Sequence, residues 1–320
     1  MLADLIVSVE RLFSGEEPGE GSCLFVIARD SGKFHAQPDL PPVPVVAIGH
    51  DAEAPEWADA VVPDEAAAQL LLDRISSHPK TAAVIVDLLR VMPELSLAHG
   101  LVAESFAYGL LQGSEEHASW LATRAPAVAH AEGQVRAERQ DACLELVLDR
   151  PAADNAIDRA MRDQLAEMLA LAAIDPTIER VLLRGAGRSF SLGADLAEFG
   201  TTRDPALAHA IRRQTLPARY AAACADKLEV HVQGACVGAG LELAAFARRI
   251  VAGPRAWFQL PELAMGVLPG AGGCVSLTRR IGRQKAALMI LSGRRIAARE
   301  ALDWGLVDEL AADDGSADEV

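Results

Sequence analysis

The chain has 320 residues, of which 51% are hydrophobic and 23% are charged. This is an ordinary globular composition, so it excludes a disordered or fibrous protein, and the length indicates one large domain or two smaller ones. The net charge is −15, with 19 acidic and 7 basic side chains in residues 1–130 against 26 and 23 in residues 131–320. Such a chain lacks the basic footprint of a nucleic-acid binder, and the uneven charge indicates two parts with different roles.

The N-terminal residues do not resemble a secretory signal, and no segment is apolar enough to span a membrane. Asp4 and Glu10 precede the first basic residue, Arg11, and no apolar run reaches the roughly 18–20 residues of a membrane span. We therefore expect a cytoplasmic protein that binds neither membranes nor nucleic acid. The five cysteines are widely spaced and form no CxxC pair, which favours reduced, buried thiols over a metal or redox site.

Residues 1–130 are predicted to hold short strands followed by helices. Two apolar runs, 23–28 and 43–48, are strand-like and flank a proline-rich loop at 37–42. A helix capped by Asp64 should end before Pro79, and further helices are predicted at 81–90, 97–113 and 114–123. We interpret residues 125–141 as a linker.

From residue 142 onwards, strand-like and helical segments alternate. Strands are predicted at 143–148, 180–183, 228–232 and 250–252, and helices at 158–173 and 241–249. This alternation is typical of an α/β fold with largely buried strands. The last residues, 311–320, are small and acidic and should form a frayed tail.

Three glycine-rich segments lie among these elements, at 191–195, 238–242 and 268–273. The second resembles a dinucleotide-binding GxGxxG turn, but Leu243 replaces its third glycine and the acid some 20 residues on, Glu262, lies in a Pro-Glu turn. A nicotinamide-dependent dehydrogenase is therefore disfavoured. A strand-to-helix turn also directs backbone N–H groups at one point, where they stabilise an oxyanion. Glu242, beside that point, either satisfies the helix dipole or takes part in catalysis.

Taken in order, these segments resemble the enoyl-CoA hydratase/isomerase, or crotonase, superfamily. Five motifs match over about residues 142–310, and the most specific are RSFSLGADL at 188–196, VQGACVGAGLELA at 232–244 and the segment 257–273. The resemblance implies an α/β fold with a crotonase-like (ββα)n spiral core. It also implies an acyl-CoA thioester substrate, no separate cofactor, no metal, and a homo-oligomer, either a trimer or a dimer of trimers.

The resemblance also assigns roles by position. The N–H groups of Ala194 and Ala239 should hold the thioester oxygen, and Glu242 and Glu262 fill the two glutamate positions of the hydratases. Isomerases usually keep one of these glutamates, so the presence of both favours hydration. The following residues are expected to bind the coenzyme A thioester: Arg188, Ser191, Leu192, Gly193, Asp195, Leu196, Gly238 and Gly240.

The chemistry agrees with these roles. Adding water to a 2-enoyl thioester needs a base for the water and an acid for the α-carbon, and two carboxylates that share one water can serve as both. Fixed donors at the thioester oxygen contribute about 2.7–4 kcal/mol each. We predict an enoyl-CoA hydratase that adds water syn. The alternatives are an isomerase or another thioester-enolate enzyme and, from a different class, a catalytically weak binding or scaffold protein.

Two further features accompany the motifs. Glu229 and His231 replace the small apolar residues that the family usually has before the second motif. Seven basic residues accompany a single acid between 277 and 300, which favours contact with substrate phosphates or another subunit over a solvated face. They are Arg279, Arg280, Arg283, Lys285, Arg294, Arg295 and Arg299.

The chain stops shortly after the core, where family members continue with helices that cover the acyl site and build the trimer. Residues 58–130 resemble that helical region. We therefore expect the helical cover (residues 58–130) to stand on the N-terminal side of the core, through permutation or fusion to a degenerate copy. The predicted division is a small β-containing segment at 1–57, the helical cover, a crotonase core at 131–312 and an acidic tail at 313–320.

Overall fold

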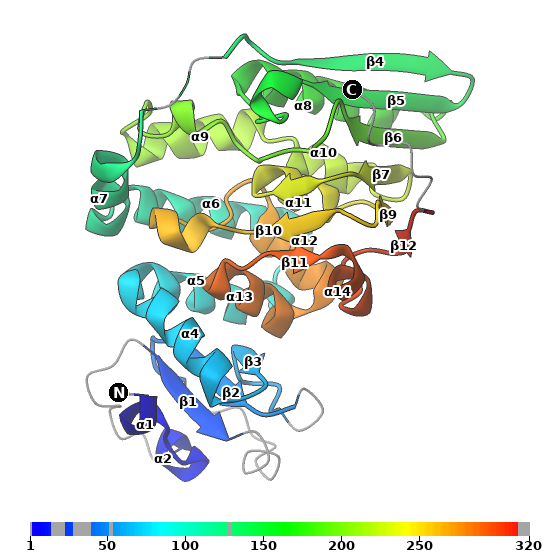
Figure 1. Ribbon diagram of the computed structural model, residues 1–320. Helices are drawn as coiled ribbons and strands as arrows, with labels where there is room; N and C mark the ends of the chain where they lie inside the picture. Colours follow the sequence, from blue (N-terminus) through cyan, green and yellow to red (C-terminus); the bar gives the residue numbers. More distant parts are fainter. Residues whose placement is uncertain are drawn as a thin grey trace.

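The computed structural model describes residues 2–13, 23–27, 40–50, 54–126, 128 and 130–312. Figure 1 shows a large sheet at one end of the molecule, a small N-terminal sheet at the other end, and helices between them. The predicted acidic tail at 313–320 lies outside the described residues. None of the helices in these ranges combines the length and the hydrophobicity needed to cross a membrane.

The N-terminal segment forms a parallel sheet of order β1-β2-β3. All four residues of β2 are buried, which explains its uninterrupted apolar sequence. Both predicted strands are confirmed, and two helices of four and five residues, which were not predicted, precede β1. The elements are α1 (Leu2–Leu5), α2 (Val9–Phe13), β1 (Leu24–Ile27), β2 (Val45–Ile48) and β3 (Ala60–Val62).

Four predicted helices follow β3. Asp64, Ser96 and Ser114 each cap a helix by accepting a backbone N–H three residues on. Pro79 ends one helix and also begins the next. In the first turn of a helix the backbone N–H has no partner within the helix, so a proline there loses no hydrogen bond. The helix predicted at 81–90 therefore starts two residues earlier. These helices are α4 (Glu65–Ser77), α5 (Pro79–Val91), α6 (Leu97–Gln112) and α7 (Glu115–Thr123), with the 3₁₀ turn η2 (Met92–Glu94) between α5 and α6.

The larger sheet has the order β12-β9-β7-β6-β5-β4. The interpretation of residues 125–141 as a linker is wrong for residues 134–140. They form the edge strand β4, which pairs antiparallel with β5 along its whole length. Six of the seven β4 residues are exposed, so their polar sequence concealed the strand. The strands are β4 (Gln134–Gln140), β5 (Cys143–Asp149), β6 (Arg180–Gly185), β7 (Leu228–Val232), β9 (Arg249–Ala252) and β12 (Glu309–Leu310).

A second core sheet of order β11-β10-β8 adjoins the glycine-rich turns. Its strands are β8 (Ala235–Val237), β10 (Trp257–Gln259) and β11 (Ile296–Ala297). The 3₁₀ turns are η3 (Pro151–Ala153), η4 (Leu196–Glu198) and η5 (Glu262–Met265). The helices are α8 (Arg159–Ile174), α9 (Pro205–Thr215), α10 (Ala218–Ala223), α11 (Ala239–Ala244), α12 (Gly273–Ile281), α13 (Arg283–Ser292) and α14 (Ala298–Asp303).

Two of these core helices were predicted from the sequence. The helix predicted at 158–173 is α8, and Asp158 caps its N-terminus. The helix predicted at 241–249 is instead α11, which starts two residues earlier and ends at Ala244. The helix does not extend to residue 249, because the Arg248 N–H donates to the Ala225 and Leu228 carbonyls instead of to a helical carbonyl. The chain then enters β9.

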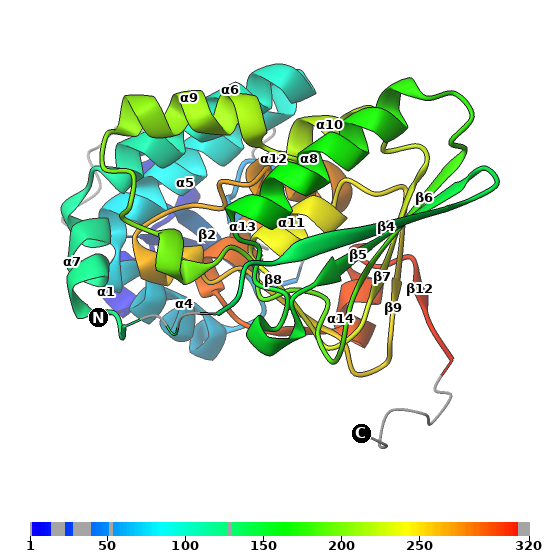
Figure 2. The same ribbon diagram turned by 90° about the horizontal axis from the view of Figure 1, so that it is seen from above.

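The helical cover packs directly on the core (Figures 1 and 2). Helix α6 lies beside α9 and α12, α7 lies beside η5, and α4 and α5 pack against α13. Residues from both parts, such as Leu89 and Leu101 of the cover and Val275 and Leu277 of α12, belong to one hydrophobic cluster. Four of the five free cysteines are buried, as predicted. The two halves therefore share one large hydrophobic cluster, and a second, smaller cluster lies within the N-terminal segment.

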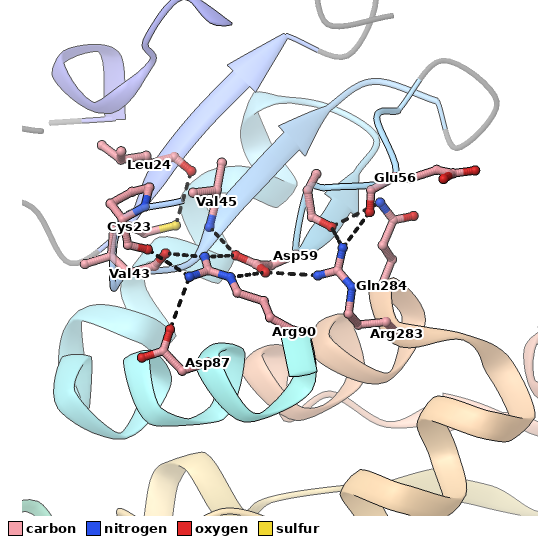
Figure 3. Close-up of polar contacts among 12 residues, drawn as sticks. Cys23, Leu24, Val43, Val45, Glu56, Asp59, Asp87, Arg90, Arg283 and Gln284 are labelled. Atoms are coloured by element: carbon pink, nitrogen blue, oxygen red, sulfur yellow. Dashed lines mark hydrogen bonds and ion pairs between the residues drawn. The ribbon is translucent and has the colours of Figure 1, made fainter. Parts of the chain in front are cut away.

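A buried ion-pair network joins the N-terminal sheet to the core (Figure 3). Asp59 is 1% exposed, and its carboxylate accepts hydrogen bonds from Arg90 at 3.0 and 2.6 Å and from Arg283 at 3.0 Å. The Val45 N–H donates to the same carboxylate at 2.8 Å. Since Arg283 begins α13 and Arg90 lies on α5, this one carboxylate connects three elements that are far apart in the chain.

This network corrects part of the prediction for the basic residues. The Arg283 guanidinium group donates to the Asp59 carboxylate. Arg280 donates to Asp308 and to the Leu306 and Ala247 carbonyls. For these two arginines the expected contact with substrate phosphates or another subunit is wrong. Glu229, 8% exposed, is held by Arg180 at 3.0 Å and by His231 at 2.6 Å.

Candidate active site

The first glycine-rich turn follows β6 and pairs with β8. The Ser191 N–H donates to the Ala235 carbonyl, and the Ser191 carbonyl accepts from Val237. The Ser191 hydroxyl is fully buried, donates to the Asn155 carbonyl at 2.8 Å and accepts from the Gly193 N–H at 3.0 Å. Ser191 therefore shapes the turn rather than facing the cavity, and it holds Gly193 in a left-handed conformation with φ +90°.

The second turn brings a free amide next to the first. Gly238 has φ +47°, and α11 starts at Ala239. A Cβ on Gly193 would lie 3.2 Å from the Ala239 nitrogen, so the two turns are in contact. Neither the Ala194 N–H nor the Ala239 N–H donates to any described residue. Both residues line the same cavity, and two such unpaired amides are suited to stabilising an oxyanion.

Glu242 stands one turn into α11 and is 2% exposed. Its Oε2 atom accepts the Ala271 N–H at 2.6 Å and the Gly273 N–H at 2.8 Å. Burial raises the pKa of Glu242 to about 7, although the two amides favour the charged form. The carboxyl group is thus held in place and titrates near neutral pH.

Glu262 begins the 3₁₀ turn η5 after Pro261 and is 8% exposed. Its Oε1 atom lies 2.9 Å from the position of a Cβ on Gly238, so a glycine there lets the carboxyl group approach the turn. Its Oε2 atom is buried and accepts no hydrogen bond from a described residue. Burial and the nearby Glu242 charge raise the pKa of Glu262 well above its usual range. Perturbed carboxyl groups of this kind are typical of acid–base sites.

A third carboxyl group, Glu104, comes from helix α6 of the helical cover and is 1% exposed. It accepts the Gly272 N–H at 2.7 Å and the Cys274 N–H at 2.9 Å, which belong to the loop that also holds Glu242. Burial, followed by the charge of Glu242, raises its pKa well above the usual range. The cover therefore contacts the loop at 271–274 directly.

Glu242, Glu262, Ala194 and Ala239 line a cavity of about 530 Å³. Of the predicted site residues, its wall includes Glu242, Glu262, Ala194, Ala239, Leu192, Gly193, Asp195, Leu196 and Gly238. Arg188, Ser191 and Gly240 do not line it. The Arg188 side chain is 84% exposed and pairs with Asp154 at 2.7 Å, and a Cβ on Gly240 would lie 2.7 Å from the Ser191 Cβ.

The prediction missed the wall residues that lie outside the matched motifs. Helices α6 and α7 supply Tyr108, Gln112 and His117, and α9 supplies Arg212. The His117 ring bonds to the Met265 carbonyl at 2.8 Å, which fixes α7 against η5. The sequence held one clue that α6 contacts the site. Glu104 lies among the apolar residues of this helix, and a carboxylate is rarely buried there without partners.

The described residues include no group of three His, Cys, Asp or Glu side chains arranged as metal ligands. The cavity wall instead offers carboxyl groups, backbone amides and three arginines, Arg159, Arg162 and Arg212. This set can move protons and stabilise an oxyanion.

Known proteins resemble the core half of the chain. Its residues 138–319 match the family model described as enoyl-CoA hydratase/isomerase. The 2,3-dehydroadipyl-CoA hydratase of Escherichia coli (strain K12) is 41% identical over 176 residues, which are 55% of this chain and 68% of that protein. The mevalonyl-coenzyme A hydratase SIDH of Beauveria bassiana is 37% identical over 54% of this chain and 65% of that protein. The chain thus spans about two thirds of the length of these curated relatives.

Solved structures agree with this likeness. The enoyl-CoA hydratase from Thermoplasma volcanium has 34% sequence identity and a TM-score of 0.51, and the match covers 57% of this chain and 73% of that chain. Pseudomonas aeruginosa AtuE has 32% identity and a TM-score of 0.53, over 57% and 72% of the two chains. The expected crotonase-type fold is confirmed, and the chain belongs to the enoyl-CoA hydratase/isomerase family of enzymes, the crotonase superfamily.

Proposed function

We propose that the protein is an enoyl-CoA hydratase, which adds water across the 2,3 double bond of a 2-enoyl-CoA thioester. The observation that supports this best is the meeting of two buried carboxyl groups, Glu242 and Glu262, with the unpaired amides of Ala194 and Ala239 at one cavity wall. Two of the relatives are named as hydratases of coenzyme A thioesters, which agrees with this proposal.

The proposed reaction uses these four groups. The amides of Ala194 and Ala239 hold the thioester oxygen. Glu242, with a pKa of about 7, removes a proton from water while the water oxygen bonds to C3. The π electrons of the double bond move towards the thioester, and the two amides stabilise the negative charge on the enolate oxygen. Glu262, whose pKa is higher, donates a proton to C2, and H and OH are thereby added to the same face.

The test follows the loss of enoyl absorbance on a panel of 2-enoyl-CoAs of different lengths. Wild-type protein should hydrate at least one of them, and Glu262→Gln should lose most of this activity, since removing a positioned acid typically costs about 10²–10⁴-fold. Glu145→Gln, on the β5 strand away from the cavity, is the matched control. Wild-type rates in Glu262→Gln would contradict the proposal. Conversion of 3-enoyl-CoA to 2-enoyl-CoA without hydration would indicate an isomerase.

The helical cover belongs to the same proposal. Its helices supply Tyr108, Gln112 and His117 to the cavity wall and Glu104 to the loop at 271–274, which supports a role in place of the helices that follow the core in relatives. A truncated chain that begins at Glu132 should then be insoluble or inactive. Full activity of that chain would show that the cover is dispensable.

We also propose that the protein is a homo-oligomer, either a trimer or a dimer of trimers. Phe106 and Leu110 on α6 and Leu207 on α9 are each more than half exposed, although they are large and apolar. Light scattering on the intact protein would test this, and a monomer at micromolar concentration would contradict it.

A further inference from the structure

Arg212 is a cation in the cavity wall for which the proposed reaction has no use. It stands on α9, is partly buried and lines the cavity together with Tyr108 and Gln112 of α6. Its guanidinium group lies over the Tyr108 ring, 4.6 Å from the ring centre. Two helices from different halves of the chain therefore place a positive charge at this part of the cavity.

The hydrogen-bond partners of Arg212 are all neutral. Its Nε donates to the Ser105 hydroxyl at 2.9 Å, Nη2 donates to the Ser105 carbonyl at 3.1 Å, and Nη1 approaches Gln112 Oε1 at 3.5 Å. Among the described residues, no carboxylate forms an ion pair with it. A guanidinium group has five N–H donors, so two of them have no acceptor here.

Unlike Arg212, two other arginines of the cavity wall form ion pairs with carboxylates. Arg159 pairs with Glu198 at 3.5 Å, and Arg162 pairs with Asp163 at 2.7 Å. Glu104 is close enough to act on the charge of Arg212, but both of its oxygens accept backbone amides. Burial lowers the pKa of Arg212, as expected for a cation whose lost hydration no anion replaces.

Tyr108 shows where this cation lies relative to the reacting groups. Its ring packs at the start of the loop at 271–274, since a Cβ on the preceding Gly270 would lie 2.2 Å from Tyr108 Cδ2. Burial raises the pKa of Tyr108 to about 12, while the charge of Arg212 opposes this shift and the charges of Glu242 and Glu262 add to it. Tyr108 is therefore within electrostatic reach of all three groups, and it separates the guanidinium from that loop.

We propose that Arg212 binds a carboxylate at the far end of the substrate's acyl chain, so that the preferred substrates are 2-enoyl-CoAs with an anionic terminus. This rests on the proposed hydratase function, which fixes C2 and C3 at the two glutamates. An acyl chain that continues past C3 along the wall meets Tyr108 and then the two unpaired N–H groups. A guanidinium fork suits a carboxylate because it can form two parallel charged hydrogen bonds with it.

A purely structural role makes a different prediction. If Arg212 only fastened α6 to α9 through Ser105, its loss would weaken activity equally on every substrate. If it binds a terminal carboxylate, its loss affects only substrates that have one. The comparison of two substrates of equal length therefore distinguishes the two roles.

The experiment measures kcat/KM on matched pairs of 2-enoyl-CoAs of four to eight carbons, one member ending in methyl and the other in carboxylate. Wild-type protein should prefer the carboxylate member of at least one pair by about ten- to a hundredfold, the effect of one or two charged hydrogen bonds. In Arg212→Gln this preference should disappear, because the carboxylate-ended substrate should lose about ten- to a hundredfold more kcat/KM than the methyl-ended one. Arg213→Gln, its exposed neighbour on α9, is the control.

A direct binding measurement separates failure of this proposal from failure of the hydratase proposal. Calorimetry on the intact protein should show tighter binding of hexanedioyl-CoA than of hexanoyl-CoA, neither of which can be hydrated. Absence of turnover on all enoyl-CoAs would overturn the hydratase function, whereas the binding preference would still support the carboxylate site. Equal affinity for the two ligands, no preference in any substrate pair, or equal losses on both members in Arg212→Gln would overturn the role of Arg212.

Discussion

Glu104 and Glu242 accept hydrogen bonds from alternate amides of one loop. The first and third amides of residues 271–274 donate to Glu242 Oε2 at 2.6 and 2.8 Å, and the second and fourth donate to Glu104 at 2.7 and 2.9 Å. Glu242 belongs to the core and Glu104 to the helical cover. The loop therefore positions the proposed catalytic carboxyl group only when both parts of the chain are in place.

Glu104→Ala should reduce both stability and activity. The substitution leaves two buried amides without acceptors, each at a cost of about 1–3 kcal/mol, and it loosens the loop that holds Glu242. We expect a lower denaturant midpoint and a kcat reduced about tenfold or more. Glu116→Ala is the matched control, because Glu116 accepts two amides at the start of α5 and does not line the cavity. It should lower stability without lowering kcat, and equal kcat losses in both variants would contradict a local role for Glu104.

The rate of hydration should depend on pH in a bell shape. Below about pH 7, protonation of Glu242 removes the base, so kcat/KM should fall about tenfold per pH unit. At high pH the rate should fall again as Glu262 loses its proton, because its pKa is raised well above the usual range. The two groups interact, so the apparent values belong to the pair. Initial rates from pH 5 to 10 would check this, and a flat profile from pH 5 to 8 would exclude Glu242 as the base.

Glu242→Gln should stabilise the fold at alkaline pH. The folded pKa of about 7 exceeds the ordinary value of 4.5, so the folded state binds the proton more tightly and wild-type stability falls as pH rises from about 4.5 to 7. Above pH 7 the penalty reaches roughly 3 kcal/mol. Glutamine carries no charge and therefore removes this penalty. Its single side-chain oxygen can still accept hydrogen bonds from the Ala271 and Gly273 amides. Thermal unfolding should show a higher Tm for the variant at pH 8 and little difference at pH 5; a lower Tm at pH 8 would contradict this.

Removal of the Asp59 carboxylate should destabilise the whole chain. Asp59→Ala leaves Arg90 and Arg283 partly buried without their shared anion, which typically costs about 3–5 kcal/mol. The midpoint of urea unfolding should fall. The variant should still unfold in one transition, because the two halves share a hydrophobic cluster. Asp87→Ala, which removes a 55% exposed partner of Arg90, should cost less than about 1 kcal/mol. Comparable losses in the two variants would argue against the buried network.

Gly238→Ala should impair catalysis more than folding. A Cβ there would lie 2.9 Å from Glu262 Oε1, in a left-handed backbone with φ +47°. We expect kcat to fall at least tenfold and stability to fall by roughly 1–2 kcal/mol from the backbone strain. Gly305→Ala also places a side chain at a positive φ, +78°, but nothing lies within 4 Å of its Cβ, so it tests a strained backbone without the contact. It should retain wild-type kcat, and a similar rate loss there would attribute the effect to stability alone.

Local features were predictable because the residues that produce them are close in the chain. Asp64, Ser114 and Asp158 cap helices through amides three residues away. The turn around Gly238 and the position of Glu242 in α11 follow from a short motif in the same way. Strand β4 escaped prediction because six of its seven residues are exposed and its pairing depends on β5 rather than on an apolar pattern of its own.

The length and the uneven charge of the sequence indicate two parts with different roles. The sequence alone determined the family, the glycine-rich turns and the identity of the glutamates, because short motifs specify local backbone geometry. Only the tertiary structure decided which groups face one another across the cavity. Tyr108 lines the cavity beside Arg212, and Glu104 holds the loop at 271–274, because the acidic half packs its helices on the core and buries a shared apolar surface. No local pattern encodes that packing, since it depends on contacts between residues more than 100 positions apart.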